Sequence, residues 1–315
     1  MTDFMNYLVL GLTRGSMYAL IALGYTLVYG VLQLINFAHS EVFMSGAFGS
    51  FIVIHAIVGT GANTASWAVP LLMLVGIVSG GLTAAGVAWT LERVAYRPLR
   101  KRGAPKLAFL ISAIGASFFL SQFAGKLFNR FQNTPFPAFY NEDSVAFHLF
   151  GARVRVIQLV IMGSAVVMMV FLDRLVSQTK LGRGIRAVSE DAPTAALMGI
   201  DIDKTISRTF VIGGALGGAA GFLFGLTLGF GNQMGFLPGV KAFAAAVLGG
   251  IGNIRGAMIG GLLLGVIENL VPTAPWVSAP WIGTKWTDVV AFVVLVLVLM
   301  FRPTGILGER LGRAA

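Results

Sequence analysis

The sequence predicts an all-α, polytopic membrane protein of about eight transmembrane helices, arranged as a single domain over residues 1–315. Hydrophobic residues make up 56% of the chain and charged residues only 11%, whereas an ordinary soluble domain carries about 25% charge. The mean hydropathy is +0.82, and most of the chain falls into apolar stretches. The bulk of the chain is therefore expected to lie in lipid.

A helix needs roughly 17–25 mainly apolar residues to cross the hydrocarbon of a bilayer. Stretches of this kind lie at residues 7–30, 42–58, 68–91, 107–125, 156–172, 209–229 and 286–301. A less regular pair, 240–250 and 256–270, is interrupted by GGIGNIRG. The first stretch has no basic leader and is too long for a cleavable signal peptide, so we expect it to be the first spanning helix.

The basic residues predict the orientation of the chain. The net charge is +10, and the 23 basic residues include six in residues 92–106, six in residues 173–208 and three after residue 301. Lys and Arg in short loops mark the cytoplasmic side, so the C-terminus is expected inside and, by parity, the N-terminus outside. No aromatic residues are spaced among these charges to stack bases, which argues against nucleic acid as a partner.

By the same parity, residues 126–155 form a periplasmic segment. It contains two prolines, several aromatic residues and a short alternating stretch. A solvated connector is favoured over a small cap that meets a partner. His148 is isolated there and is expected to be a surface residue and not a metal ligand.

Glycine spacing marks one of the predicted helices. Gly213, Gly217, Gly221, Gly225 and Gly229 recur every four residues, which places them on one slowly drifting face. Such a face lets a second helix backbone approach closely. These glycines are expected to pack helices, either within this chain or at an interface that slides, and the spacing does not separate the two.

Polar residues interrupt the apolar pattern between the first two predicted helices. The segment LINFAHSEVFMSG, residues 34–46, places Asn36, His39, Ser40 and Glu41 close together. Buried polar groups need partners in a membrane, and charged ones are costly. Two interpretations stay open: a cytoplasmic turn in which Ser40 or Asn36 caps the next helix, or a helix break beside a polar pathway.

A second interruption is AVLGGIGNIRGAMIGG, residues 246–261, where glycines permit tight turns and Arg255 has apolar flanks. Non-helical backbone at membrane depth is tolerated only against protein or a water-filled cavity. The segment is therefore either a broken or re-entrant element that lines a pore, or a plain inner loop. Glu268 and Arg14 are isolated charges near the ends of apolar stretches and are expected to extend toward the membrane surface.

Residues 173–208 form a long polar stretch with five acidic and six basic residues. Asp191 can cap a short helix that tolerates Pro193 in its first turn. Ala195 and Ala196 are small enough for close contact with a partner, and Gly199 suits the end of such a helix. The stretch is expected to be a folded docking loop on the water side of the membrane.

Catalytic chemistry has little support in the sequence. There is no G-x-x-x-x-G-K-[ST] phosphate loop, and GGIGNIRG has the wrong spacing and flanks for a dinucleotide site. The chain has no cysteine, and its three histidines lack the spacing of metal ligands. No catalytic residue, metal or cofactor is expected, and any hydrolysis that drives this chain is expected in another subunit.

Several segments occur in an order that resembles a known family. They are GLTRGSMYALIALGYTLVYG (11–30), INFAHSE (35–41), ERVAYRPLR (92–100), LGRGIRAVSEDAPTAALMGI (181–200), PGVKAFAAAVLGGIGNIRGAMIGGLLLG (238–265) and RPTGILG (302–308). Over nearly the whole chain they resemble the LivH-type inner-membrane permeases of branched-chain amino acid ABC importers. Ser40 departs from the glycine that commonly follows the histidine in that family.

The resemblance implies a permease subunit that carries branched-chain or other hydrophobic amino acids, delivered by a periplasmic binding protein, across the bacterial inner membrane. It also implies a second, homologous permease subunit, two cytoplasmic ATPase subunits and a cytoplasmic coupling helix. The match assigns coupling to Arg186, Ala187, Glu190, Asp191, Ala195, Ala196 and Gly199. Candidates for the substrate pathway are Asn36, His39, Ser40 and Glu41.

Two alternatives remain open. Relatives in the same family carry urea or short amides, and an ion-coupled secondary transporter would need no ATPase. The second alternative predicts paired carboxylates or a charged ring within the membrane, and the apolar stretches contain few. Such a carrier would also have no use for a docking loop.

Overall fold

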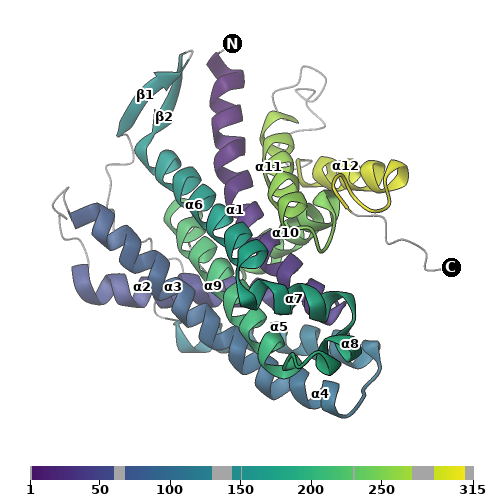
Figure 1. The fold of residues 1–315 in the computed structure, drawn as a ribbon. Coiled ribbons are helices and arrows are strands. Elements are labelled where there is room, and N and C mark those ends of the chain that lie inside the picture. Colours follow the sequence, from purple (N-terminus) through teal and green to yellow (C-terminus); the bar gives the residue numbers. More distant parts are fainter. Residues whose placement is uncertain are drawn as a thin grey trace. The chain divides into compact units, whose positions relative to one another are not determined.

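Helices dominate the computed structural model, which describes residues 2–59, 68–129, 144–149, 151–229, 231–271 and 287–308 (Figure 1). In chain order the elements are α1 (Thr2–Leu32), α2 (His39–Val58), α3 (Val69–Leu91), η2 (Glu92–Tyr96), α4 (Arg97–Lys101), α5 (Lys106–Leu127), β1 (Val145–Leu149), β2 (Ala152–Arg155), α6 (Val156–Gln178), α7 (Lys180–Glu190), α8 (Ala192–Leu197), α9 (Ile202–Leu228), α10 (Phe236–Gly249), α11 (Ile254–Leu270) and α12 (Thr287–Phe301).

Six helices in the described part of the chain are long and apolar enough to cross a bilayer. They are Phe4–Leu32, His39–Val58, Val69–Lys101, Lys106–Leu127, Val156–Gln178 and Ile202–Leu228. The helices α10, α11 and α12 are shorter, at 14, 17 and 15 residues. The prediction of a polytopic, mainly helical membrane protein is confirmed.

A small sheet departs from the all-helical expectation. β1 and β2 pair antiparallel within the predicted outer segment, and His148 lies opposite Arg153 in their register. Gly151 turns the chain between the strands at a φ of 86°, a conformation that favours glycine. His148 is exposed. Residues 130–143 of the predicted outer segment lie outside the described residues.

The chain divides into two compact units, each assembled from segments that are distant in the sequence. The first unit comprises Met1–Thr26, Asn141–Met169 and Lys241–Ala315. The second comprises Leu27–Tyr140 and Val170–Val240.

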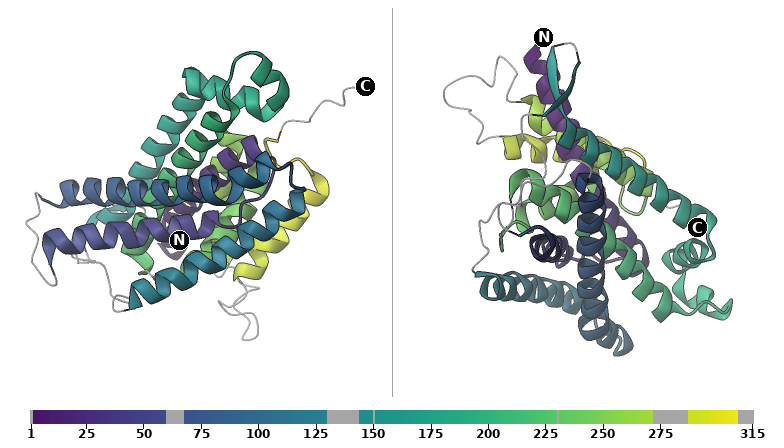
Figure 2. Two further views of the ribbon diagram at one scale, coloured as in Figure 1. Left: turned by 90° about the horizontal axis from the view of Figure 1, so that it is seen from below. Right: turned by 90° about the vertical axis from the view of Figure 1, so that its left-hand side faces the viewer.

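The second unit is built around α2, α3 and α9, each of which packs against the other two (Figure 2). Glycine makes this packing possible. A methyl group on Gly46 of α2 would overlap the backbone of Gly218 of α9, and one on Gly218 would overlap the carbonyl of Gly80 of α3. The three backbones therefore approach one another where none carries a side chain.

The glycines predicted to form a packing face lie on α9. The buried members are Gly213, Gly217, Gly221 and Gly225. A methyl group on Gly217 would lie 3.4 Å from His39 Nε2, and one on Gly221 would overlap the carbonyl of Phe43, so both face α2. Gly229 differs from the prediction. It ends α9 at a φ of 76° with open space around it, so it terminates the helix and does not pack.

The helix predicted at 68–91 continues beyond its expected end. After α3 the chain makes one π-helical turn, η2, and enters α4. Glu92 is fully buried, at 0% exposed, and binds Arg100 at 3.0 Å. Asp203 of α9 binds Arg97 at 2.9 Å and also contacts Arg100. Basic residues expected in a loop therefore belong to a helix that ion pairs hold against α9.

In the first unit, α10 and α11 are joined by a tight turn. α10 ends at Gly249, and Gly250 and Gly252 turn the chain at φ angles of 112° and 94°. Asn253 caps α11, because its side-chain oxygen accepts a hydrogen bond from the N–H of Gly256 at 3.1 Å. The predicted interruption is therefore a turn between two helices.

The C-terminal segment, residues 302–308, binds this turn. The N–H groups of Ile306 and Leu307 donate to the carbonyls of Leu248 and Gly249, each at 2.9 Å. The side-chain amide of Asn253 donates to the carbonyl of Leu307, also at 2.9 Å. The last carbonyls of a helix have no partner within that helix. The segment supplies two donors that the end of α10 lacks.

Candidate functional site

The polar segment between α1 and α2 is buried. Asn36 Oδ1 accepts a hydrogen bond from the N–H of Ala38 at 3.1 Å and another from the hydroxyl of Tyr96 at 2.6 Å. Ser40 donates to the carbonyl of Phe37 at 2.7 Å. Neither Asn36 nor Ser40 caps α2, whose N-terminus has no side-chain cap. The capping part of the first interpretation is therefore wrong, and the segment is a buried break between two helices.

Glu41 lies in the first turn of α2 and is 3% exposed. Its Oε1 lies 3.4 Å from the hydroxyl of Ser117 on α5 and 3.5 Å from that of Ser40, so both hydrogen bonds are long. Its Oε2 has no hydrogen-bond partner among the described residues. Among the described residues, no Lys or Arg forms an ion pair with the Glu41 carboxylate.

Glycine also borders this carboxylate. A methyl group on Gly235 would lie 2.8 Å from Glu41 Oε2, so this position accepts no larger residue without movement. The structure brings the four predicted pathway residues into one buried cluster, Asn36, His39, Ser40 and Glu41. A buried carboxylate held by two weak hydrogen bonds is suited to accept a charged donor.

The polar stretch 173–208 contains the expected short helix. Thr179 caps α7, because its hydroxyl oxygen accepts a hydrogen bond from the N–H of Gly182 at 3.1 Å. Asp191 separates α7 from α8 with an extended backbone and is the N-cap residue of α8, with Pro193 in the first turn. Gly199 follows α8 at a φ of 83°. Pro193 and Gly199 therefore lie where they were predicted, but Asp191 makes no side-chain cap bond and accepts from the hydroxyl of Thr194 instead.

One face of α7 and α8 is anchored in the second unit. Ile185, Val188 and Ala195 belong to a buried cluster that also contains Tyr96 and Phe210. Ala195 is 3% exposed, so the prediction that its methyl group contacts a partner is wrong. The methyl group packs against its own chain instead. The other predicted coupling residues are the exposed Arg186, Glu190, Asp191, Ala196 and Gly199 and the half-buried Ala187.

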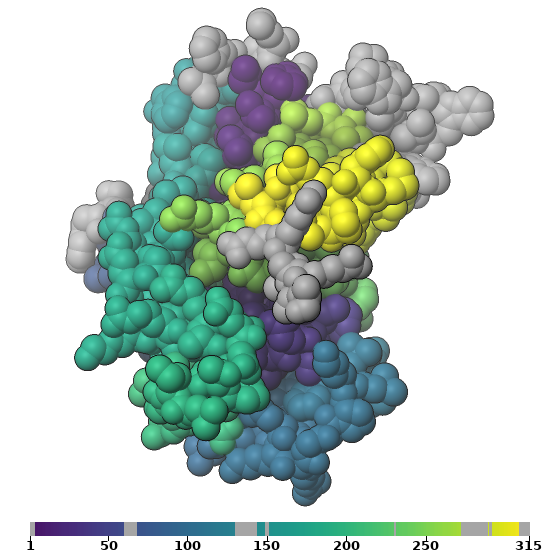
Figure 3. All heavy atoms as spheres, turned by 45° about the vertical axis from the view of Figure 1, so that its right-hand side comes forward, coloured from purple at the N-terminus to yellow at the C-terminus, as the bar shows by residue number. Residues whose placement is uncertain are grey.

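The opposite face of α7 and α8 is exposed. The two helices form part of the teal-green surface in Figure 3. Two apolar side chains stand out there. Leu197 is 88% exposed and Met198 is 79% exposed. Neither residue is among the predicted coupling residues, although two adjacent large apolar residues within a polar stretch are a usable signal.

A family model described as the branched-chain amino acid transport system permease component matches residues 7–299. The chain belongs to this permease family. The high-affinity branched-chain amino acid transport system permease protein LivH of Escherichia coli (strain K12) is 44% identical over 309 residues, which cover 97% of this chain and 96% of the relative. The corresponding protein BraD of Pseudomonas aeruginosa is 44% identical over 313 residues, with the same coverage.

A more distant relative is described as a probable branched-chain amino acid transport permease protein LivH from Methanocaldococcus jannaschii. It is 30% identical over 300 residues, which cover 92% of this chain and 88% of the relative. The family resemblance inferred from the motifs is therefore confirmed, and this permease is a multi-pass membrane protein.

A second buried charge cluster in this permease was not predicted. Glu268 of α11 is 6% exposed and binds Lys241 Nζ at 2.9 Å, while Arg14 lies 3.9 Å away. Lys241 Nζ also lies 5.9 Å from the ring centre of Tyr18. Glu268 was expected to extend toward the membrane surface, and that prediction is wrong. The ion pair with Lys241 offsets the cost of burying its charge.

The described residues contain no group of three or more His, Asp or Glu side chains that could hold a metal ion. Their buried carboxylates serve different purposes. Glu92 and Glu268 each face a cation, whereas Glu41 faces only hydroxyl groups. Of these three carboxylates, Glu41 is therefore the one without a cation partner among the described residues.

Proposed function

We propose that this chain is the membrane-spanning permease subunit of an ATP-driven importer of branched-chain or other hydrophobic amino acids in the bacterial inner membrane. Family membership and the six apolar helices support the proposal. The sequence has no phosphate loop, so ATP hydrolysis would belong to two separate cytoplasmic ATPase subunits. A second, homologous permease subunit and a periplasmic binding protein would complete the complex, with the C-terminus in the cytoplasm.

The exposed end of α8 is the observation that carries this proposal. Leu197 and Met198 present adjacent apolar side chains on a segment whose other face is anchored. Exposed apolar surface marks contact with a protein or with the membrane, and here it lies within a polar stretch and not on a spanning helix. A methionine side chain adapts to an irregular groove. The small, exposed Ala196 leaves room for a partner surface beside them. We infer that this end of α8 inserts into a groove of an ATPase subunit.

The docking segment is connected to the buried polar break before α2. The side-chain amide of Gln33 donates to the carbonyl of Ser189 on α7 at 3.3 Å. The buried face of α7 and α8 shares one cluster with Tyr96, whose hydroxyl group holds Asn36. Movement of α7 and α8 by an ATPase would therefore reach the start of α2 through packed side chains and hydrogen bonds.

Glu41 is the residue best suited to recognise an amino acid at the other end of this connection. Its Oε2 has no partner among the described residues, and the α-ammonium group of an amino acid is a charged donor. A hydrogen bond to a charged group is worth about 1.5–3 kcal/mol. A neutral solute such as urea or a short amide gains no such charge pairing. The buried carboxylate therefore supports the amino acid over the amide.

Association with an ATPase subunit tests the docking proposal. Changing Leu197→Asp together with Met198→Asp places two carboxylates in the proposed apolar contact, so co-purification of the ATPase and ATP-dependent leucine uptake into proteoliposomes should both be lost. Changing Leu197→Met together with Met198→Leu keeps the apolar surface and should preserve both. The variant Ala196→Trp should block docking by its size.

Two results would refute the proposal. The first is ATPase association that survives both the aspartate pair and the tryptophan. The second is leucine uptake by the wild-type chain reconstituted without any ATPase subunit. The second result would favour the ion-coupled carrier.

A further inference from the structure

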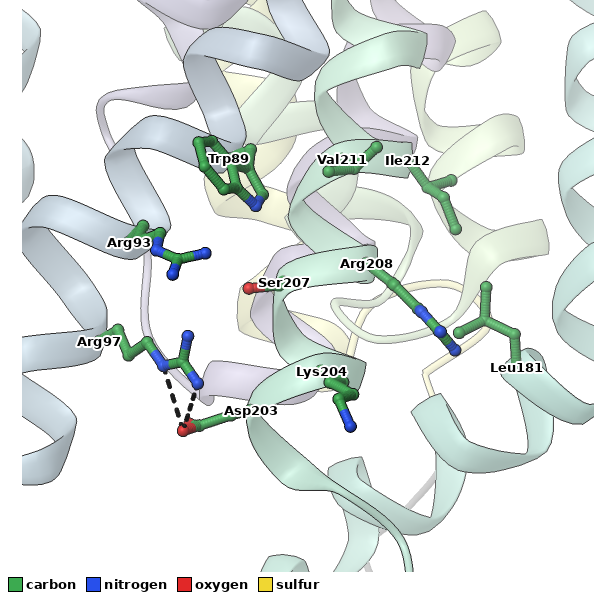
Figure 4. Close-up of a pocket in the computed structure, with 10 residues that line it drawn as sticks. All are labelled: Trp89, Arg93, Arg97, Leu181, Asp203, Lys204, Ser207, Arg208, Val211 and Ile212. Carbon is green, nitrogen blue, oxygen red and sulfur yellow. Dashed lines mark hydrogen bonds and ion pairs between the residues drawn. The ribbon is translucent and has the colours of Figure 1, made fainter.

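A basic pocket lies in the second unit, between the end of α3 with its continuation and the first turns of α9 (Figure 4). Its volume is about 500 Å³. Four basic side chains and one acidic side chain line it, together with an apolar wall. None of its lining residues belongs to the buried cluster around Glu41, so the pocket is separate from the proposed substrate residues.

The pocket contains more positive charge than its own carboxylate neutralises. Asp203 binds Arg97, whose Nε and Nη2 donate to one carboxylate oxygen at 3.1 and 2.9 Å. Lys204 pairs at 3.0 Å with the aspartate that caps α9. Arg93 and Arg208 form no ion pair within the described part of the chain. Two arginines therefore remain for an external anion, and arginine suits phosphate in particular.

The pocket is divided into an apolar end and a charged end. Figure 4 shows Trp89, Val211 and Ile212 at one end and the Arg97–Asp203 pair at the other. The guanidinium of Arg93 lies 5.1 Å from the ring centre of Trp89, which holds the arginine between the two ends. Tryptophan is enriched at the level of lipid headgroups. A fitting occupant has a phosphate and a hydrocarbon part.

An apolar ridge on α3 leads to the apolar end. Its exposed members recur at helical spacing and are Leu71, Leu74, Val78, Leu82 and Trp89. The ridge belongs to a helix that is long and apolar enough to cross the membrane. Hydrocarbon chains lying along this ridge would reach the pocket with their headgroup at Arg93.

We propose that this pocket binds the phosphate headgroup of an anionic phospholipid. Arg93 binds the phosphate, while Arg208, whose side chain extends toward Leu181 in Figure 4, adds positive charge to the pocket. The acyl chains lie against Val211, Ile212 and the α3 ridge. Basic pockets between transmembrane helices are known to suit such headgroups. A free phosphate ion would use only the charged end and leave the apolar wall without a partner, so the lipid is the source that matches the whole pocket.

Lipid retention tests this proposal on the full chain. Wild-type protein extracted in mild detergent is expected to retain phosphatidylglycerol or cardiolipin in excess over phosphatidylethanolamine, measured by mass spectrometry. Removing each arginine is expected to weaken retention roughly fivefold, so changing Arg93→Gln with Arg208→Gln should reduce it on the order of twentyfold. The matched control changes Lys101→Gln with Arg102→Gln, two exposed basic residues outside the pocket, and should retain the lipid.

A second measurement separates lipid from free phosphate and controls for misfolding. In nanodiscs, phosphatidylglycerol should raise the unfolding temperature of the wild type but not of the double variant, and inorganic phosphate added to nanodiscs of phosphatidylethanolamine should raise neither. Arg208→Lys keeps the positive charge, so it should retain lipid. This variant tests the role of the charge even if the double variant fails to fold. Equal lipid retention by wild type and double variant would overturn the proposal. The proposal would also be overturned if inorganic phosphate alone stabilised the wild type. It would be overturned as well if the double variant lost ATPase association while its lipid retention stayed unchanged.

Discussion

Two buried glutamates, Glu41 in the second unit and Glu268 in the first, have similar exposure but different partners. Glu268 faces Lys241 at 2.9 Å with Arg14 beyond it, so its charge is compensated within the chain. Glu41 faces the hydroxyl groups of Ser117 and Ser40 at 3.4 and 3.5 Å and has no Lys or Arg partner among the described residues. The Oε2 atom of each glutamate has no hydrogen-bond partner among those residues, so the cation is what distinguishes them.

We expect this difference to separate a charge that stabilises the fold from one that serves transport. A buried ion pair is costly to break, because the remaining charge is left without compensation. A buried carboxylate without a cation contributes no such pairing to stability, and ionisable groups within membrane segments typically mark solute or ion pathways. Glu268 is therefore expected to matter for folding and Glu41 for transport.

The largest effect should come from breaking the compensated pair. Lys241→Met leaves Glu268 buried with the weaker Arg14 pair at 3.9 Å, and it should lower the free energy of unfolding by about 3–5 kcal/mol. Thermal unfolding in detergent measures this change. Replacing both residues, Lys241→Met with Glu268→Met, should recover most of the loss. A double variant that is less stable than either single variant would contradict the assignment of this pair as structural.

Glu41→Gln should have the opposite pattern, with a small effect on stability and a large effect on transport. Its effect on the free energy of unfolding should stay within about 1 kcal/mol, because it breaks no ion pair and leaves the side-chain shape intact. Leucine uptake in the reconstituted complex should fall tenfold or more, which corresponds to at least about 1.4 kcal/mol. Unchanged uptake would remove Glu41 from the pathway and erase the contrast with Glu268.

Ser117→Ala sharpens the comparison with a smaller change. It removes one long hydrogen bond to Glu41 Oε1, so uptake should fall several-fold and less than for Glu41→Gln. A net hydrogen bond is worth about 1 kcal/mol. Ser121→Ala is the matched control on the same helix, because Ser121 donates to the carbonyl of Asn232 and not to Glu41. Equal losses in the two variants would indicate a general effect on α5.

The smallest effect is expected from Arg14→Gln. Arg14 lies 3.9 Å from Glu268, and its side chain is 32% exposed. Pairs of this kind contribute about 0–1 kcal/mol, so the unfolding temperature should change little compared with Lys241→Met. A loss as large as that of Lys241→Met would show that the cluster acts as a triad and not as one pair.

Hydropathy predicted the helices well because apolar length is a local property of the sequence. The predicted span at 107–125 corresponds to α5 at Lys106–Leu127, and the start at 156 matches α6. The continuation of α3 was not predicted, because the charges of residues 92–100 read locally as a loop. Their compensation depends on Asp203, which is more than a hundred residues away in the sequence.

In the candidate site, too, local features were predictable from the sequence and tertiary contacts were not. The clustering of the four residues at 36–41 was predictable because they are neighbours in the sequence. The bond from Tyr96 to Asn36 and the contact of Glu41 with Ser117 required the tertiary fold. Ala195 was assigned to the wrong face because a residue of its size suits either a partner or the core, and only the position of α8 decides between them.

The backbone bonds from residues 306 and 307 to the end of α10 also bear on biosynthesis. The carbonyls of Leu248 and Gly249 obtain these donors only from residues 306 and 307, each 58 positions later in the chain. The α10–α11 turn therefore completes its hydrogen bonding only after residues 302–308 have been synthesised. A nascent chain interrupted before this segment would expose two carbonyl groups at the end of α10 that have donors in the finished fold.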